Sequence, residues 1–141
     1  MKRQDVREHL FRLLFRLEFD GMADMTEETA YYFVAPSEEE DVIDARFGEA
    51  DRLYILKKYE NIRADREKLD EIINDASRGW DIHRMGKVEL TILRLAVYEI
   101  LFDDDIPVGV AIDQAVELAK KYGQDESSAF VNGILANIAR R

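Results

Sequence analysis

A short polar turn carries the side chains in this sequence that are best suited to bind another molecule. Residues 122–128 read Y-G-Q-D-E-S-S and lie between two apolar helical patterns. Tyr122 offers a ring on which a base of a single-stranded nucleic acid can stack, a contact worth about 1–3 kcal/mol. Gln124, Ser127 and Asn132 offer hydrogen-bonding groups for base edges or phosphate. Each also has an ordinary structural interpretation: the ring can cap the core, the serine can cap a helix and the amide can bond nearby backbone.

Catalytic chemistry has little support in the sequence. No histidine follows the serines of the turn to act as their base. His9 and His83 are the only histidines and cysteine is absent, which leaves too few good ligands for a zinc site. The glycine-rich phosphate-binding motifs and the nucleophile motif of hydrolases are also missing. We therefore expect no catalytic residue, no metal site and no cofactor, and we interpret the chain as a protein that is not an enzyme.

The charge balance works against unaided binding to nucleic acid. The 141-residue chain has a formal net charge of −10, whereas free-standing nucleic-acid binders usually present basic surface to phosphates. A local basic patch or a partner protein would have to offset this charge. The sequence also lacks cysteine, an apolar run long enough for a membrane span and the apolar core of a signal peptide, so we expect a cytoplasmic protein.

Helical spacing of apolar residues recurs along the chain, and alternating strand patterns are absent. We predict an all-α fold of six or seven helices that form two small packed bundles in one domain, residues 1–141. The N-terminal half covers about residues 1–78 and the C-terminal half about residues 79–141.

Four helices are expected in the first half, over about residues 5–19, 26–34, 42–62 and 66–78. The first has an apolar stripe formed by Val6, Leu10, Leu13, Leu14 and Leu17. His9 lies opposite this stripe and is expected to face water. In the third helix, Leu53, Leu56 and Tyr59 recur at helical spacing and are expected to face the core.

The second half begins with the most apolar segment of the chain, residues 85–102. A helix that is apolar on most faces is typically the most buried one, so we expect this segment at the centre of its bundle. Arg94 is flanked by apolar residues there and is assigned a structural role, with Glu99 or Glu117 as candidate partners.

Residue types that commonly start or end helices mark the bounds of the next two helices. Pro107 fits the start of a helix, where its missing N–H is not needed. Lys120 and Lys121 complement the dipole at the end of that helix, and Gly123 fits the left-handed residue that terminates it. The last helix is expected to begin around residues 125–128.

Several segments of the second half share the order and spacing of a known family. Trp80 is followed by K-V-E-L-T-I-L-R-L-A-V-Y-E-I-L at 87–101, I-P-V-G-V-A-I-D-Q-A-V-E-L-A-K at 106–120 and Y-G-Q-D-E-S-S-A-F-V-N-G-I-L at 122–135. Over roughly 55 residues this resembles the NusB family of transcription antitermination factors, a match far more specific than a short motif. The first half resembles the family mainly in R-x-x-V-R-E-H-L-F-R-L-L-F at its start and L-D-E-I-I before the tryptophan.

The resemblance implies an all-helical fold of two small bundles and a role in ribosomal RNA synthesis. Members of the family pair with NusE, which is also a protein of the small ribosomal subunit. The pair binds the boxA sequence of nascent RNA and, with other Nus factors in the elongation complex, helps RNA polymerase to read through terminators. The domain also occurs joined to RNA cytosine methyltransferases, for which this chain is too short.

The resemblance also implies a basic N-terminal patch that meets RNA. Lys2, Arg3 and Arg7 match this patch, although a solvated helix start is an alternative interpretation. Gln4 and Asp5 stand where many members are basic, so the patch is weaker than usual.

The polar turn is the second element that the family uses against RNA. The predicted RNA-binding residues are therefore Lys2, Arg3, Arg7, Tyr122, Gln124, Ser127 and Asn132. This hypothesis requires the two ends of the chain to share one surface. Ala129 replaces a residue that is often basic in the family, which removes further positive charge.

For the protein partner, the resemblance implicates the start of the apolar helix near residue 87. Glu89 matches an acidic position that contacts the basic NusE, and Arg84 and Lys87 are its neighbours. An ordinary exposed acid is the alternative interpretation of Glu89. The net charge of −10 would favour encounter with a basic ribosomal protein.

Two alternatives stay open at this point. The chain could be a helical adapter that binds protein without contacting RNA directly, as its acidic balance would suit. It could also form a homodimer, since some family members self-associate through the RNA-binding face.

Overall fold

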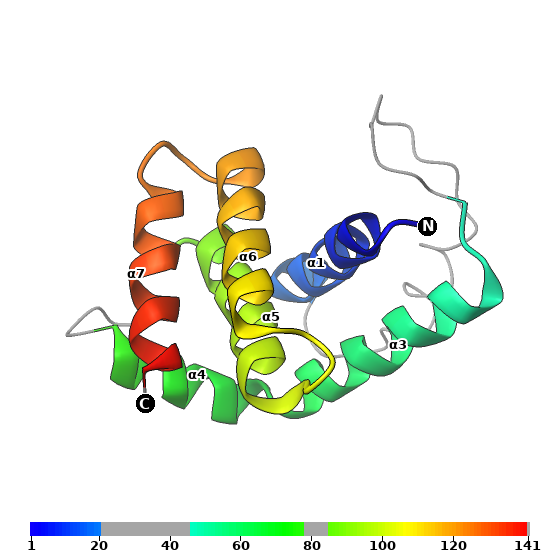
Figure 1. Ribbon diagram of the computed structural model, residues 1–141, viewed down its shortest axis with the longest axis horizontal. Coiled ribbons are helices and arrows are strands. Elements are labelled where there is room, and N and C mark those ends of the chain that lie inside the picture. Colours follow the sequence, from blue (N-terminus) through cyan, green and yellow to red (C-terminus); the bar gives the residue numbers. More distant parts are fainter. Residues whose placement is uncertain (21–45, 78–84, 141) are drawn as a thin grey trace. The chain divides into compact units, whose positions relative to one another are not determined.

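The computed structural model describes residues 1–20, 46–77 and 85–140. Within these ranges the chain forms helices and no strand, which confirms the predicted all-α class. The helices are α1 (Arg3–Asp20), α3 (Glu49–Ala64), α4 (Arg66–Ala76), α5 (Lys87–Phe102), α6 (Val108–Tyr122) and α7 (Ser127–Ala139) (Figure 1). The helix predicted over residues 26–34 lies outside the described residues. No helix in the described ranges combines the length and apolarity needed to cross a membrane.

The chain separates into two compact units, Met1–Asn61 and Ile62–Arg141. The boundary falls in the last turn of α3. Helix α4 groups with the C-terminal unit because it packs against α5 and α7. The sequence suggested a division near residue 78, which would have placed α4 in the N-terminal half.

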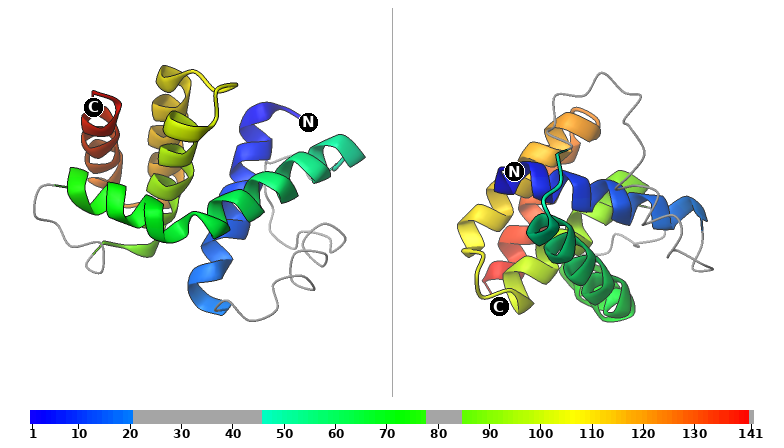
Figure 2. Two further views of the ribbon diagram at one scale, coloured as in Figure 1. Left: turned by 90° about the horizontal axis from the view of Figure 1, so that it is seen from below. Right: turned by 90° about the vertical axis from the view of Figure 1, so that its right-hand side faces the viewer.

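The C-terminal unit is built around three helices in mutual contact. Helices α5, α6 and α7 alternate in direction, and α4 crosses near the C-terminal end of α7 (Figures 1 and 2). Every residue of α5 from Leu90 to Val97 is buried, as expected for a helix that is apolar on most faces. Helix α6 contributes small buried side chains at intervals of four, which share one face and let its neighbours approach closely. These are Ala111, Ala115 and Ala119.

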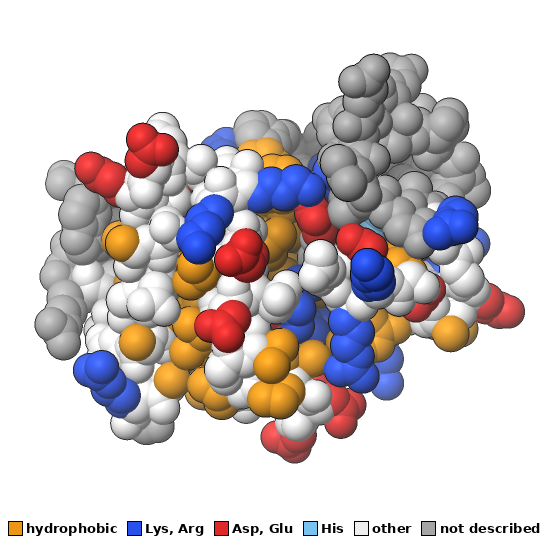
Figure 3. Space-filling view, turned by 45° about the horizontal axis from the view of Figure 1, so that its top comes forward, with side chains coloured by type: hydrophobic (Ala, Val, Ile, Leu, Met, Phe, Trp, Pro, Cys, Tyr) orange, Lys and Arg blue, Asp and Glu red, His pale blue; other side chains and the backbone are white. Residues whose placement is uncertain are grey.

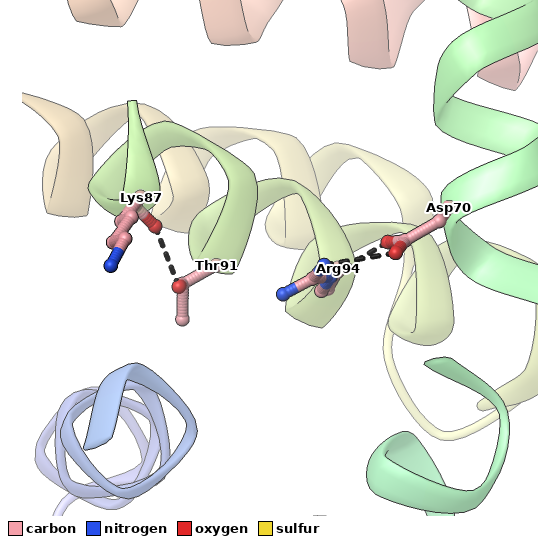
Figure 4. Close-up of polar contacts among 4 residues, drawn as sticks. All are labelled: Asp70, Lys87, Thr91 and Arg94. Carbon is pink, nitrogen blue, oxygen red and sulfur yellow. Dashed lines mark hydrogen bonds and ion pairs between the residues drawn. The ribbon is translucent and has the colours of Figure 1, made fainter. Parts of the chain in front are cut away.

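A nearly buried ion pair joins α4 to α5. Arg94 is 7% exposed, and its Nε and Nη2 donate to the two carboxylate oxygens of Asp70 at 2.7 and 2.9 Å (Figure 4). Such two-point pairs are strong and directional, so this pair helps to fix how α4 packs on α5. Glu117, a partner suggested by the sequence, instead lies 3.6 Å from the ammonium of Lys120 on its own helix.

In the N-terminal unit, α1 is buried on more than one face. The predicted apolar stripe is buried as expected, from Val6 to Leu17. His9 was predicted to face water, but it is only 3% exposed. Its ring centroid lies 4.6 Å from that of Phe47. The prediction was wrong because a single stripe locates one buried face and carries no information on what covers the opposite face.

The buried face of α3 also differs from the predicted one. Leu53 is 60% exposed, whereas Ile55 and Tyr59 are fully buried and Ile62 is 1% exposed. These three residues follow the spacing i, i+4, i+7, which keeps one face of a helix more closely than the i, i+3, i+6 series used in the prediction. The prediction was therefore right for Tyr59 and wrong for Leu53.

Candidate nucleic-acid interface

The polar segment singled out in the sequence forms a tight connection between two antiparallel helices. Helix α6 ends at Tyr122 and α7 begins at Ser127; we call residues 123–126 the α6–α7 turn (Figure 1). The N–H of Gly123 donates to the carbonyl of Ala119 at 2.9 Å. The φ of Gly123 is −94°, so the predicted left-handed stop was wrong. Glycine is needed there for space, because a Cβ would lie 2.6 Å from the Ser127 hydroxyl oxygen and 2.7 Å from the Ala119 carbonyl oxygen.

A chain of hydrogen bonds holds the α6–α7 turn in place. The Ser127 N–H donates to the Gln124 carbonyl at 3.0 Å, and the Gln124 N–H donates to the Ser127 hydroxyl oxygen at 2.9 Å. The Ser127 hydroxyl in turn donates to Glu89 Oε1 at 2.5 Å. Ser127 is only 5% exposed. Its hydroxyl therefore acts within the protein, and any contribution of Ser127 to ligand binding would pass through the turn that it holds.

The exposed part of the α6–α7 turn is polar and acidic. Gln124, Asp125 and Glu126 are exposed, and so is Asn132 on α7. Acidic side chains project from this end of α6 and α7, at the upper left of Figure 3. Carboxylates repel phosphate, whereas the side chains of Gln124 and Asn132 can donate and accept hydrogen bonds. The turn is therefore better suited to the edges of bases than to a phosphate backbone.

A cation accompanies the aromatic ring at the end of α6. Tyr122 is partly exposed, and the ammonium of the exposed Lys121 lies 5.5 Å from its ring centroid. A base that stacks on this ring would also meet a positive charge, which stabilises stacked nucleic acid. Lys121 was not among the predicted site residues, because its position in the last turn of a helix was already explained by the helix dipole. Its position directly before the tyrosine was the signal that could have identified it.

The predicted N-terminal cations divide into exposed and buried members. Lys2 and Arg3 are exposed where α1 begins, but Arg7 is only 8% exposed. The Lys2 carbonyl accepts the N–H groups of Asp5 and Val6, both at 3.0 Å, which starts the helix. Exposed positive charge at this end therefore comes from Lys2 and Arg3. They belong to the N-terminal unit and the α6–α7 turn to the C-terminal unit, so a common surface stays a prediction.

Two of the predicted partner-binding residues, Lys87 and Glu89, lie at the start of α5. Lys87 is exposed, and its carbonyl accepts the Thr91 hydroxyl at 2.7 Å (Figure 4). Glu89 is partly exposed and bonds to Ser127. Arg84 lies outside the described residues. The predicted partner-binding acid and the predicted RNA-binding turn are thus joined directly, a link between residues 38 positions apart that no local pattern revealed.

Comparisons with known proteins by sequence and by structure agree on one family. The sequence profile of the NusB family matches residues 4–140. The transcription antitermination protein NusB of Lachnoclostridium phytofermentans is 44% identical, with 98% of each chain covered. The solved structure of T. maritima NusB is 32% identical with a TM-score of 0.83, and the match covers 100% of this chain and 92% of that one.

A further structural neighbour is a complex. NusB solved together with NusE and double-stranded RNA is 28% identical with a TM-score of 0.80, and the match covers 98% of this chain and 96% of that one.

These matches extend over almost the whole chain, and the chain belongs to the NusB family of transcription antitermination proteins. The family predicted from the second half of the sequence is therefore confirmed. Membership also agrees with the prediction that the chain is not an enzyme, since its relatives are transcription antitermination proteins.

Proposed function

We propose that this protein promotes read-through by RNA polymerase during ribosomal RNA synthesis. It binds boxA-type single-stranded RNA together with NusE and acts in the cytoplasm within an elongation complex that holds other Nus factors. The observation that carries the proposal is membership of the NusB family over residues 4–140. The neighbour solved with NusE and RNA supports the same pair of partners.

In this proposal the two candidate elements take different parts of the RNA. Lys2 and Arg3 neutralise phosphates, and Arg7, being nearly buried, supports the start of α1. Tyr122 stacks on a base, and Gln124 and Asn132 bond to base edges. Ser127 holds the α6–α7 turn.

The start of α5 meets NusE. Lys87 and Glu89 are both accessible there, and Arg84 is proposed with them from the family resemblance. A protein with a formal net charge of −10 is attracted to a basic ribosomal protein at long range. Its affinity for RNA alone is expected to be weak for the same reason.

Fluorescence anisotropy with a labelled boxA RNA, measured with and without purified NusE, tests the proposal. We expect weak binding by this protein alone and at least tenfold tighter binding when NusE is present. Scrambled single strands and a boxA duplex serve as competitors, because the solved neighbour contains double-stranded RNA. Equal competition by scrambled RNA would contradict recognition of boxA, and stronger competition by the duplex would contradict recognition of a single strand.

The acidic surface of the α6–α7 turn favours one alternative, a helical adapter that binds protein only. Asp125 and Glu126 are exposed beside the residues proposed to meet RNA. An adapter would bind NusE but would produce no anisotropy change with boxA RNA, whether or not NusE is present. Light scattering over a concentration series tests the additional proposal that the free protein forms a homodimer.

A further inference from the structure

One hydrogen-bonded chain connects the first turn of α5 with the α6–α7 turn. It runs from the Gln124 N–H to the Ser127 hydroxyl and from that hydroxyl to Glu89 Oε1, at 2.9 and 2.5 Å. Each link is specific in direction, because a hydroxyl that donates to a carboxylate keeps its oxygen available to accept an N–H. A hydrogen bond to an ionised acceptor is also about twice as strong as a neutral one. Glu89 therefore orients the Ser127 hydroxyl, and that hydroxyl fixes the backbone of Gln124.

Two glycines lie against the residues of this hydrogen-bonded chain. A Cβ at Gly86, the residue before α5, would collide with the Glu89 carboxylate. A Cβ at Gly123, the residue after α6, would lie 2.6 Å from both the Cβ and the hydroxyl oxygen of Ser127. At Gly86 the nearest atom is Glu89 Oε2, the end of a flexible side chain, so a rotation of that side chain could relieve the contact. At Gly123 the nearest atoms include the Ala119 carbonyl oxygen of the backbone, and the φ is not positive, so glycine is explained there by the close approach alone.

Ser127 and Glu89, the two residues that form the link, differ in their exposure to solvent. Ser127 is 5% exposed, so it cannot contact a ligand without a change in the turn. Glu89 is partly exposed, and only its Oε1 bonds to Ser127. A carboxylate oxygen can accept more than one hydrogen bond, and the second oxygen adds further capacity. A basic group that approaches from solvent can therefore bind Glu89 without displacing Ser127.

We propose that Glu89 is a positioning residue for the α6–α7 turn and that it couples partner binding at α5 to RNA binding at the turn. The proposal rests on the proposed function, because it takes the partner to be basic and the ligand of the turn to be RNA. A cation of the partner that holds the Glu89 carboxylate also holds Ser127 and the Gln124 backbone in place. RNA then binds a turn that is already ordered, so less conformational entropy is lost when RNA binds. The binding of the partner therefore increases the affinity for RNA. Such coupling typically amounts to about 5- to 150-fold in affinity.

The positioning role is tested first without any ligand. Amide hydrogen exchange of the folded protein is followed by NMR for Glu89→Ala and Glu89→Gln, with Glu60→Ala, an exposed acid of α3, as control. Glu89→Ala should accelerate exchange of the Gln124 amide by at least about tenfold relative to core amides of α5, because the orientation of its acceptor is lost. Glu89→Gln retains a side-chain oxygen that can accept the Ser127 hydroxyl and should restore most of the protection. Unchanged exchange at Gln124 in Glu89→Ala would overturn the positioning role.

The coupling is tested with Ser127→Ala, which breaks the link and leaves the Glu89 carboxylate available to the partner. The affinity for boxA RNA is measured with and without NusE, and the ratio of the two affinities gives the coupling. We expect this ratio to fall to about one, while the affinity of Ser127→Ala for NusE alone stays within about twofold of wild type. A circular dichroism melt confirms that the variant is folded.

Two outcomes distinguish the failure of this inference from failure of the proposed function. A wild-type ratio that persists in folded Ser127→Ala would overturn the coupling and leave the proposed function standing. Absence of RNA binding by wild type under both conditions would contradict the proposed function and, with it, the coupling. The exchange experiment still decides the positioning role in that case. If Ser127→Ala does not fold, Ser127→Gly, which also removes the hydroxyl and leaves the Glu89 carboxylate intact, is measured in the same cycle, and a wild-type ratio in that variant would overturn the coupling.

Discussion

The start of α1 and the α6–α7 turn are both proposed to meet RNA, yet they are built in opposite ways. At the start of α1, two exposed cations stand on long side chains, Lys2 and Arg3. At the α6–α7 turn the exposed charges are negative, and the backbone is held by hydrogen bonds to Ser127. Flexible cations neutralise phosphates whatever the sequence of the RNA, whereas fixed donors and acceptors discriminate between bases. If both regions meet RNA as proposed, the first region contributes affinity and the second contributes discrimination.

The contrast also bears on the charge of the protein, because the proposed RNA surface belongs to a chain with a formal net charge of −10. Asp125 and Glu126 would weaken any phosphate contact at the turn, which leaves base contacts as the productive ones. The opposing features of the two regions lead to predictions that differ in magnitude, in salt dependence and in the RNA sequences affected.

The largest effect is expected from Gly123→Ala, which fills the space that the turn needs. The new Cβ would lie 2.6 Å from Ser127 and 2.7 Å from the Ala119 carbonyl oxygen, so the turn must shift. Overpacking of this kind costs about 1–3 kcal/mol in the free energy of unfolding. We also expect at least tenfold weaker binding of boxA RNA.

Gly133→Ala on α7 is the matched control for Gly123→Ala, since a Cβ there meets nothing within 4 Å. Replacing a glycine in a helix interior should stabilise the protein by about 0.5–1 kcal/mol. Urea denaturation and anisotropy measure both variants. Wild-type affinity in a destabilised Gly123→Ala protein would show that RNA binding does not depend on the geometry of the turn.

Removal of the ring at the end of α6 should have the next largest effect. Tyr122→Ala loses a stacking platform worth about 1–3 kcal/mol per base, or roughly 5- to 150-fold in affinity. Tyr122→Phe retains the ring and should bind RNA within about twofold of wild type. The loss should persist at high salt, because stacking is not an ionic contact. An equally large loss in Tyr122→Phe would assign the contribution to the hydroxyl instead of the ring.

The helices of the C-terminal unit could be predicted closely because their apolar pattern is dense and their ends are marked. The predicted segment 85–102 and the observed α5, Lys87–Phe102, differ by two residues at the start. Pro107 was predicted to mark a helix start, and it is the N-cap of α6. When nearly every turn contributes apolar residues to one core, local spacing determines the element almost unaided.

Contacts between distant segments could not be predicted, because spacing describes a helix without its neighbours. Arg94 pairs with Asp70 on another helix, 24 residues away. His9 meets Phe47, although it lies opposite the apolar stripe of α1. The residue types in the α6–α7 turn predicted a polar binding element, but the sequence could not show that Ser127 faces Glu89 inside the protein.

Gly123 shows a related limit in the prediction of the candidate site. A glycine after a helix commonly adopts the left-handed conformation, and that general rule gave the predicted φ. The observed φ of −94° is open to any residue, so the reason for glycine is the close approach of Ser127. Only the geometry of the turn can distinguish these two uses of the same residue.

A smaller and salt-dependent effect is expected at the start of α1. The double variant Lys2→Ala/Arg3→Ala should bind boxA RNA several-fold more weakly at low salt. The plot of log affinity against log salt has a negative slope, and its magnitude should decrease by about 1.4, at roughly 0.7 for each lost phosphate contact on a single strand. Lys57→Ala, an exposed lysine of α3, is the control and should leave the slope unchanged. The affinity for boxA RNA and the affinity for scrambled RNA should fall equally. A loss that is selective for boxA RNA would assign discrimination to this region as well.

The smallest effect is expected from Asn132→Ala, and it most sharply separates affinity from discrimination. Asn132 is exposed on α7 and its amide is proposed to bond a base edge in contact with solvent, so its removal should cost about 0.5 kcal/mol, the low end for a hydrogen bond, or roughly twofold in affinity for boxA RNA. Asn74→Ala on the exposed face of α4 is the matched control and should have no effect. The loss should be confined to boxA, because a base-edge contact has value only when the correct base is present. If Asn132→Ala instead weakens boxA and scrambled RNA equally, its amide contacts the sugar–phosphate backbone, and α7 contributes affinity in the same way as the start of α1.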